Sequence, residues 1–217
     1  MKIRGVSYVL MAIFGTLTGL YPAAYGFFAA SGVHASGVLH DKSAALLASR
    51  LYLGAFYLHI AFGGIALLIG WLQFSERLRT RNLRLHRLVG KTYLTAVFFS
   101  SSAGFGIALF ANGGPVCMTG FGLLAICWFY TAMQGYRSVL RLDIERHRRW
   151  MIRNYALTFA AVTLRMYLPL ATFAMHLPFI PAYRVISWLC WVPNLIFAEL
   201  LIRRRASIAV APAGIRR

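Results

Sequence analysis

The stretch of sequence that decides the fold is residues 92–136, TYLTAVFFSSSAGFGIALFANGGPVCMTGFGLLAICWFYTAMQGY, which contains no Asp, Glu, Lys or Arg. Asn112-Gly113-Gly114-Pro115 interrupts it near the middle, and such a cluster is a strong turn signal. The parts on either side, about residues 93–111 and 118–136, approach the roughly 20 residues that a helix needs to cross a bilayer. Their apolar residues run on without two-residue alternation, which favours helices over the strands of a membrane barrel. We therefore expect two membrane-spanning helices joined by a tight turn.

The same criterion predicts four more spans, so the expected fold class is an all-α, polytopic transmembrane helical bundle of six spans in a single membrane domain, residues 1–217. The additional spans are about residues 6–30, 51–74, 151–175 and 185–202, and a basic tail follows at residues 203–217. Lys2 and Arg4 before the first span also fit a signal peptide. The apolar stretch is longer than the roughly 7–15 residues at the core of such a peptide, so we expect a retained helix.

Composition agrees with a membrane protein and excludes two other classes. Of the 217 residues 59% are hydrophobic and 13% are charged, whereas a soluble domain carries about 25% charged residues. The formal net charge is nevertheless +18. A nucleic-acid-binding protein would carry its cations on a polar surface, which a chain with a mean hydropathy of +0.64 does not offer. We expect no nucleic-acid partner.

The positions of the cations predict the orientation of the helices. Of the 23 Lys and Arg residues, 19 lie in the termini or in the loops after the second and fourth spans. Basic loops stay in the cytoplasm, so both termini are expected on the cytoplasmic side of a bacterial cytoplasmic (inner) membrane. There they would face anionic headgroups. The remaining four are Lys42, Arg50, Arg165 and Arg184.

An internal repeat relates the two basic loops. Shifting the sequence by 61 residues aligns Gln73 with Gln134 and His86-Arg87 with His147-Arg148. The repeated unit is a helical hairpin closed by a basic loop, and parallel repeats tend to place functional groups at their interface. The repeat predicts that His86 and His147 lie at equal depth on neighbouring helices.

Two ionisable residues fall inside the predicted spans and form a second candidate site. His59 and Arg165 have similar depth in the outer half of the bundle, with no acidic residue available there. Because an unpaired Arg in a membrane costs at least about 2.5–3.5 kcal/mol, a ligand such as a quinone or an anion would stabilise it. The alternative is structural: Arg165 binds backbone carbonyls near Pro169, and His59 is hydrogen-bonded in the core.

The two repeated histidines also have two interpretations. Neutral imidazoles are the usual axial ligands of low-spin b-type heme, so His86 and His147 are candidate heme-iron ligands. Alternatively, the His-Arg pairs lie at the headgroup level and bind lipid phosphate, or they bind another metal. No sequence motif of a hydrolase, a protease or a nucleotide-dependent enzyme occurs.

The segments LHIAFGGIALLIGWLQF (58–74), LHRLVGKTY (85–93) and ERHRRWMIRNYAL (145–157), with Arg165 beyond them, resemble a bacterial family of predicted membrane proteins classed as a domain of unknown function. The resemblance covers about residues 50–170. More distantly, the histidines resemble the four-helix core of two-heme b-type cytochromes, including ascorbate-dependent and ferric-reductase-like proteins. That resemblance implies His86 and His147 as one axial pair and His59 as half of another. The fourth span has no histidine, so the resemblance supports at most one bis-histidine heme b.

The leading functional hypothesis is a b-type heme or quinone-interacting electron-transfer bundle. His86 and His147 would bind heme, while His59 and Arg165 would contact a second ligand such as quinone. The alternatives are a non-enzymatic protein that binds or transports a small anion or lipid at Arg165, and an accessory subunit of a membrane complex. Whether the protein is an enzyme is left open by the sequence.

Overall fold

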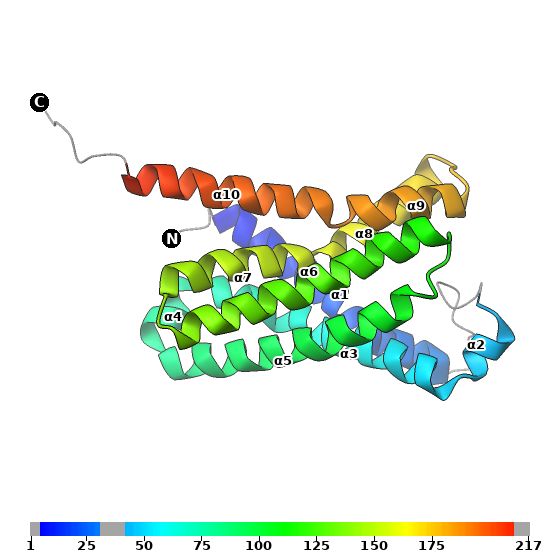
Figure 1. Cartoon of the computed structure of the whole chain (residues 1–217), viewed down its shortest axis with the longest axis horizontal. Helices are drawn as coiled ribbons and strands as arrows, with labels where there is room; N and C mark the ends of the chain where they lie inside the picture. The colour runs from blue at the N-terminus through cyan, green and yellow to red at the C-terminus, as the bar shows by residue number, and fades with distance from the viewer. Residues whose placement is uncertain (1–4, 31–41, 211–217) are drawn as a thin grey trace, which may run out of the picture.

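A computed structural model of the protein describes residues 5–30 and 42–210, and within them every regular element is a helix (Figure 1). Side chains are described for residues 8–22 and 42–204. The terminal cations Lys2, Arg4, Arg216 and Arg217 lie outside this part of the chain. The all-helical fold class predicted from the sequence is confirmed for the described residues.

Four helices form the centre of the bundle. They are α3 (Arg50–Gly70), α5 (Leu83–Ala108), α6 (Pro115–Leu140) and α7 (Ile144–Thr158). Helix α3 packs against α5 and α7, and α6 packs against the same two helices. Helices α5 and α7 therefore face each other diagonally across the interior.

The predicted tight turn separates α5 from α6. Gly113 and Gly114 have φ values of 91° and 72°, a conformation that side chains with a Cβ rarely adopt, and Pro115 occupies the first turn of α6. A short 3₁₀ helix, η1 (Trp71–Phe74), and α4 (Glu76–Arg81) connect α3 to α5. These connections make α3–α5 and α6–α7 two successive helical hairpins, as the repeat predicts.

The other helices cover this centre. Helix α1 (Gly5–Ala30) packs against α3 and α8 (Ala160–Pro169). A π-helical turn, η2 (Leu170–Ala174), follows α8. Helices α9 (Phe179–Leu189) and α10 (Val192–Val210) pack against α6 and α7, respectively. The short helix α2 (Ala44–Ala48) precedes α3.

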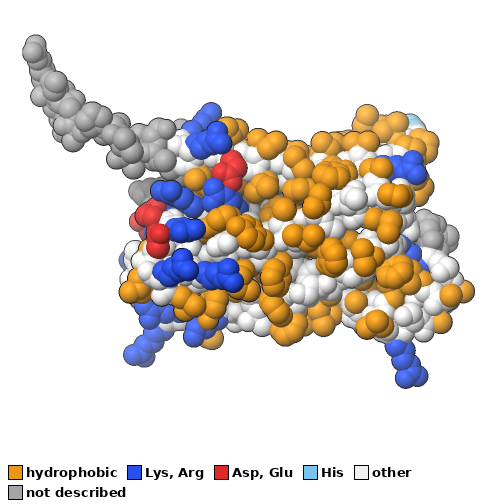
Figure 2. Space-filling view, viewed as in Figure 1, with side chains coloured by type: hydrophobic (Ala, Val, Ile, Leu, Met, Phe, Trp, Pro, Cys, Tyr) orange, Lys and Arg blue, Asp and Glu red, His pale blue; other side chains and the backbone are white. Residues whose placement is uncertain are grey.

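Charged side chains gather at one end of the bundle, where α4, the first turns of α5 and α7 and the end of α10 lie (Figures 1 and 2). We call this the basic end. The opposite end contains α2, the α5–α6 turn and the turn between η2 and α9. Apolar side chains cover the visible surface between the two ends (Figure 2), as expected for a surface in contact with lipid.

Four helical segments of the described chain are long and apolar enough to cross a membrane. They are Arg50–Phe74, Pro115–Leu140, Ile144–Ala174 and Phe179–Arg204. Helix α5 has 26 residues but is less apolar, because basic residues occupy its first turns and Ser100–Ser102 its middle. In α1 the apolar stretch with described side chains is Tyr8–Pro22.

Two predicted spans are broken where the sequence analysis expected continuous helices. The 151–175 span begins earlier, at Ile144, is interrupted at Phe159, and changes to π geometry after Pro169, whose ring removes a backbone donor. The 185–202 span consists of α9 and α10, which meet at Cys190–Trp191. Thr163 and Asn194 donate to the Cys190 carbonyl at 2.5 and 3.0 Å, so neighbouring side chains satisfy the backbone at the break.

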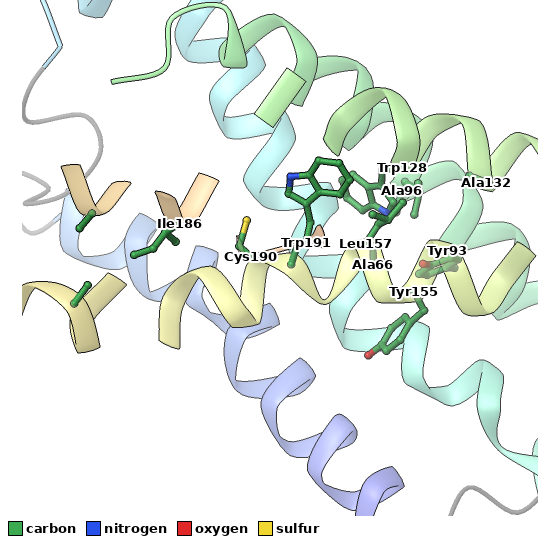
Figure 3. Packing of buried hydrophobic residues seen from close by; sticks show 14 residues of the cluster. Ala66, Tyr93, Ala96, Trp128, Ala132, Tyr155, Leu157, Ile186, Cys190 and Trp191 are labelled. Carbon is green, nitrogen blue, oxygen red and sulfur yellow. The ribbon is translucent and has the colours of Figure 1, made fainter. Parts of the chain in front are cut away.

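Aromatic, aliphatic and small residues fill the core, among them Tyr93, Trp128, Leu157 and Trp191 (Figure 3). Gly70 allows the closest approach, because a Cβ at this position would lie 2.5 Å from the Tyr155 ring and 2.7 Å from the Tyr93 ring. Close packing around small residues is what associates helices in lipid, where burial of apolar surface gives little driving force.

Candidate functional site

His86 and His147 occupy equivalent positions at the basic end. Asn82 caps α5 by accepting from the backbone N–H of Leu85 at 3.0 Å, and Asp143 caps α7 by accepting from Arg146 at 2.9 Å. Each histidine is the fourth residue after its cap, and the backbone N–H of the histidine donates to the backbone carbonyl of that cap. The 61-residue repeat therefore includes the caps, which set both histidines at the same height on their helices.

The hydrogen bonds of the two imidazoles differ. His147 Nδ1 donates to the Gly135 carbonyl at 2.8 Å, which fixes the ring and leaves Nε2 with the lone pair in the neutral form. His86 Nδ1 is buried and has no hydrogen-bond partner. In the described residues it is one of three such side-chain atoms, with Trp71 Nε1 and Tyr155 Oη. Buried polar atoms without a partner are rare in proteins, so this nitrogen requires an explanation.

The surroundings of His86 favour its neutral, metal-binding form. Burial lowers the pKa of His86 below its usual 6.5, and the positive charges of His147, Arg79 and Arg87 lower it further. The two imidazoles lie on α5 and α7, which face each other diagonally, at the same position relative to their caps.

The side chain of Gln73 fills the space beside Gly90, which lies one turn after His86 on α5. A Cβ at Gly90 would lie 3.2 Å from Gln73 Oε1. Gln73 also donates to the His86 carbonyl at 3.4 Å.

The number of available ligands distinguishes the kinds of metal site. The described residues contain no group of three or more His, Cys, Asp or Glu side chains that could hold a metal ion. A zinc site needs at least three protein ligands, whereas a six-coordinate heme needs two.

The second candidate pair lies toward the opposite end. Arg165 on α8 donates from Nη1 to the Ala161 carbonyl at 3.0 Å, and its guanidinium lies 4.8 Å from the ring centroid of Tyr21 on α1. Helix α1 packs against both α3, which carries His59, and α8, which carries Arg165. The role of the two residues stays a prediction.

His59 is held in one orientation. Its Nδ1 donates to the Ser100 carbonyl at 2.9 Å, while the Ser100 hydroxyl donates back to the His59 carbonyl at 2.8 Å. Gly104 makes room for the ring, because a Cβ there would lie 2.8 Å from Nδ1. Among the described residues, His59 Nε2 has no hydrogen-bond partner.

A buried polar network, which the sequence did not predict, lies between the two sites. Tyr93, Trp128, Thr131, Asn154 and Thr158 hydrogen-bond to one another at 2.6–2.9 Å across α5, α6 and α7. All five are buried. Uncharged polar residues within apolar spans were the available signal, but a hydropathy pattern does not show which of them face one another.

A family model described as "Predicted membrane protein (DUF2306)" matches residues 56–202. The match includes both histidines of the basic end, His59 and Arg165, and reaches beyond the 50–170 range of the resemblance noted in the sequence. No curated protein and no solved structure matches the chain.

Proposed function

The chain belongs to this family of predicted membrane proteins, and from that premise we propose that it is an integral membrane protein that binds one b-type heme for electron transfer. The supporting observation is the pairing of His86 and His147 on diagonal helices at equal register. Four-helix membrane bundles bind cofactors between side chains that project from facing helices into the interior.

His86 and His147 would hold the heme iron through their ring nitrogens. The hydrogen bond from His147 Nδ1 to the Gly135 carbonyl is the kind of support that orients a ligating imidazole and raises its basicity. The lowered pKa of His86, caused first by burial, keeps its nitrogen unprotonated at neutral pH. Arg79 and Arg87, whose charges reach His86, are suited to bind the propionates. Heme iron, when bound, supplies one-electron redox chemistry.

The test is an absorption spectrum of protein produced with heme supplied and purified in detergent. We expect a Soret band and, on reduction, the sharp bands of a low-spin bis-histidine heme. His86→Ala and His147→Ala should each abolish the low-spin spectrum. His176→Asn is the matched control, because His176 lies at the opposite end and Asn tolerates its φ of 52°. A folded protein without a Soret band, or a spectrum that survives both alanine variants, contradicts the proposal.

The proposal includes the orientation expected from the charges: six spans in a bacterial inner membrane, with the basic end and both termini in the cytoplasm. The cations gathered at the basic end support it (Figure 2), since basic loops are retained inside. Asn112→Cys and Asp143→Cys place a thiol in the turns at the two ends. In intact cells a membrane-impermeant maleimide should label Asn112→Cys and should not label Asp143→Cys. The reverse labelling pattern would show that the topology is inverted.

A further inference from the structure

Helix α7 and its cap carry charged side chains that line a surface pocket of about 410 Å³ at the basic end. Six side chains line this pocket, which we call the α7 pocket: Asp143, Glu145, Arg146, Arg149, Trp150 and Arg153. Most of them recur every three or four residues and therefore share one face of the helix. Because α7 begins at the basic end and runs into the bundle (Figure 1), the two carboxylates are the outermost members and Arg153 is the innermost.

Two of the three arginines have no partner. Arg153 donates to both carboxylate oxygens of Glu199, so its charge is balanced. Arg146 and Arg149 are exposed, and their guanidinium groups form no hydrogen bond or ion pair with the described residues. The planar fork of donors on a guanidinium matches the oxygens of a phosphate group. The α7 pocket therefore offers two free guanidinium groups to an oxyanion.

The carboxylates of the α7 pocket require a donor from the same ligand. Asp143 Oδ1 accepts from the backbone N–H of Arg146 at 2.9 Å, and Glu145 Oε1 accepts from Arg148 at 3.2 Å. The second oxygen of each carboxylate has no partner among the described residues. Because an ionised carboxylate can only accept, the ligand must carry hydroxyl or ammonium groups beside its oxyanion.

The net charge distinguishes these two kinds of ligand. When the ion-pair partners Arg148 and Glu199 are included, four arginines stand against three carboxylates, which leaves one positive charge. A ligand with a single negative charge and uncharged donors balances it. A zwitterionic phosphate with an ammonium group does not, since its own net charge is zero.

The surroundings of the α7 pocket favour a lipid over a soluble anion. The Trp150 ring meets the ring of Tyr130 on α6 edge-on, with 5.7 Å between the centroids. Tyr130 is exposed, as are Ile126 and Leu123, one and two turns further from the basic end on α6. Trp and Tyr side chains concentrate at the headgroup level of membranes. An exposed apolar stripe thus leads from the pocket toward the interior of the bilayer, where an acyl chain can lie.

We propose that the α7 pocket binds the headgroup of an anionic phospholipid that carries free hydroxyl groups. The phosphodiester accepts from Arg146 and Arg149, in the manner of basic pockets that recognise lipid headgroups. Its hydroxyl groups donate to Asp143 and Glu145, and its acyl chains follow the exposed stripe of α6. This site requires that the basic end lies at the membrane surface, and it does not depend on the heme proposal.

The test is native mass spectrometry of the full chain released from detergent micelles, titrated with one dioleoyl phospholipid at a time. We expect phosphatidylglycerol to bind at least fivefold more tightly than zwitterionic phosphatidylethanolamine. It should also bind at least threefold more tightly than phosphatidylmethanol, which has the same charge and no hydroxyl group. Soluble glycerol 3-phosphate at the same concentration should not displace it. Equal binding of phosphatidylglycerol and either other lipid, or displacement by glycerol 3-phosphate, overturns the proposal.

Arginine variants assign the phosphate contacts. Arg146→Gln combined with Arg149→Gln should weaken phosphatidylglycerol binding at least fivefold. Arg81→Gln combined with Arg84→Gln is the matched control, because both arginines are exposed at the same end and neither lines the α7 pocket. Unchanged binding in the first double variant, or an equal loss in the control, contradicts the assignment.

A carboxylate variant assigns the hydroxyl contacts. Asp143→Asn combined with Glu145→Gln makes the α7 pocket more positive, and Asn still caps α7. Binding of phosphatidylmethanol should therefore be kept or strengthened, while the preference for phosphatidylglycerol should disappear. A preference that survives in this variant contradicts the roles of Asp143 and Glu145.

Discussion

The phenol of Tyr93 on α5 donates a 2.6 Å hydrogen bond to the side-chain carbonyl oxygen of Asn154 on α7 and lies 2.7 Å from Thr158 Oγ1. Asn154 in turn donates to the Trp128 carbonyl and to Thr131 on α6. Tyr93 and Asn154 are 1% and 0% exposed. A fully satisfied buried network of this kind specifies how α5, α6 and α7 rotate against one another.

Tyr93→Phe should lower the free energy of unfolding by about 1–3 kcal/mol, because it leaves the Asn154 oxygen without its donor in a buried site. The measurement is thermal unfolding in detergent. Tyr130→Phe is the control, since Tyr130 is 51% exposed and the change removes the same hydroxyl from the surface. Equal midpoints for the two variants would show that the network contributes no stability.

Two glycines of α3 should respond in opposite directions to alanine. At Gly70 the new Cβ would lie 2.5 Å from the buried Tyr155 ring, so Gly70→Ala must displace the helix or the ring and destabilise the fold by about 1–3 kcal/mol. At Gly54 no atom lies within 4 Å, and Gly54→Ala should stabilise the helix by up to about 1 kcal/mol. Thermal midpoints in detergent test both, and a stable Gly70→Ala protein would contradict the close packing.

His86 should make the heme-free protein less stable in acid. Burial, followed by the charges of His147, Arg79 and Arg87, lowers the pKa of His86 below 6.5. The unfolded chain therefore takes up the proton first as pH falls through about 6.5, and stability decreases until the folded pKa is reached. Wild type should lose more thermal stability than His86→Gln between pH 7.5 and 5.5. Parallel losses in the two proteins would show that His86 does not contribute.

The ion pair between α7 and α10 should contribute more to the stability of the fold than the surface pair beside it. Arg153 donates to both carboxylate oxygens of Glu199 at 2.5 and 3.0 Å, whereas Arg148 contacts Glu145 once at 3.2 Å. Glu145→Gln should change stability by at most about 0.5 kcal/mol, as for exposed helical pairs. Glu199→Gln should lower the midpoint of thermal unfolding further, because it weakens a bidentate contact between helices. A larger effect of Glu145→Gln would contradict this order.

Several features were predictable because they are local. The tight turn at Asn112–Pro115 follows from its own residues, and the equal register of His86 and His147 follows from caps and basic loops 61 residues apart. The helix breaks at Phe159 and Cys190 were not predicted from the sequence. The backbone groups at these breaks are hydrogen-bonded to partners from another helix or a later turn, and the local sequence does not reveal such partners. Apolar residues surround these breaks, so the hydropathy is unchanged across them.

The sequence by itself determined that the chain is a helical membrane protein, which of its segments are apolar, and which loops carry the positive charge. Only the tertiary structure decided that α5 and α7 face each other diagonally, that Tyr93 meets Asn154, and that Arg165 lies over the ring of Tyr21. The physical reason is the solvent. In a bilayer both the lipid-facing and the inward-facing sides of a helix are apolar, so hydropathy reveals the length of a span and hardly its rotation. That rotation is determined by packing and by polar contacts between helices distant in the sequence.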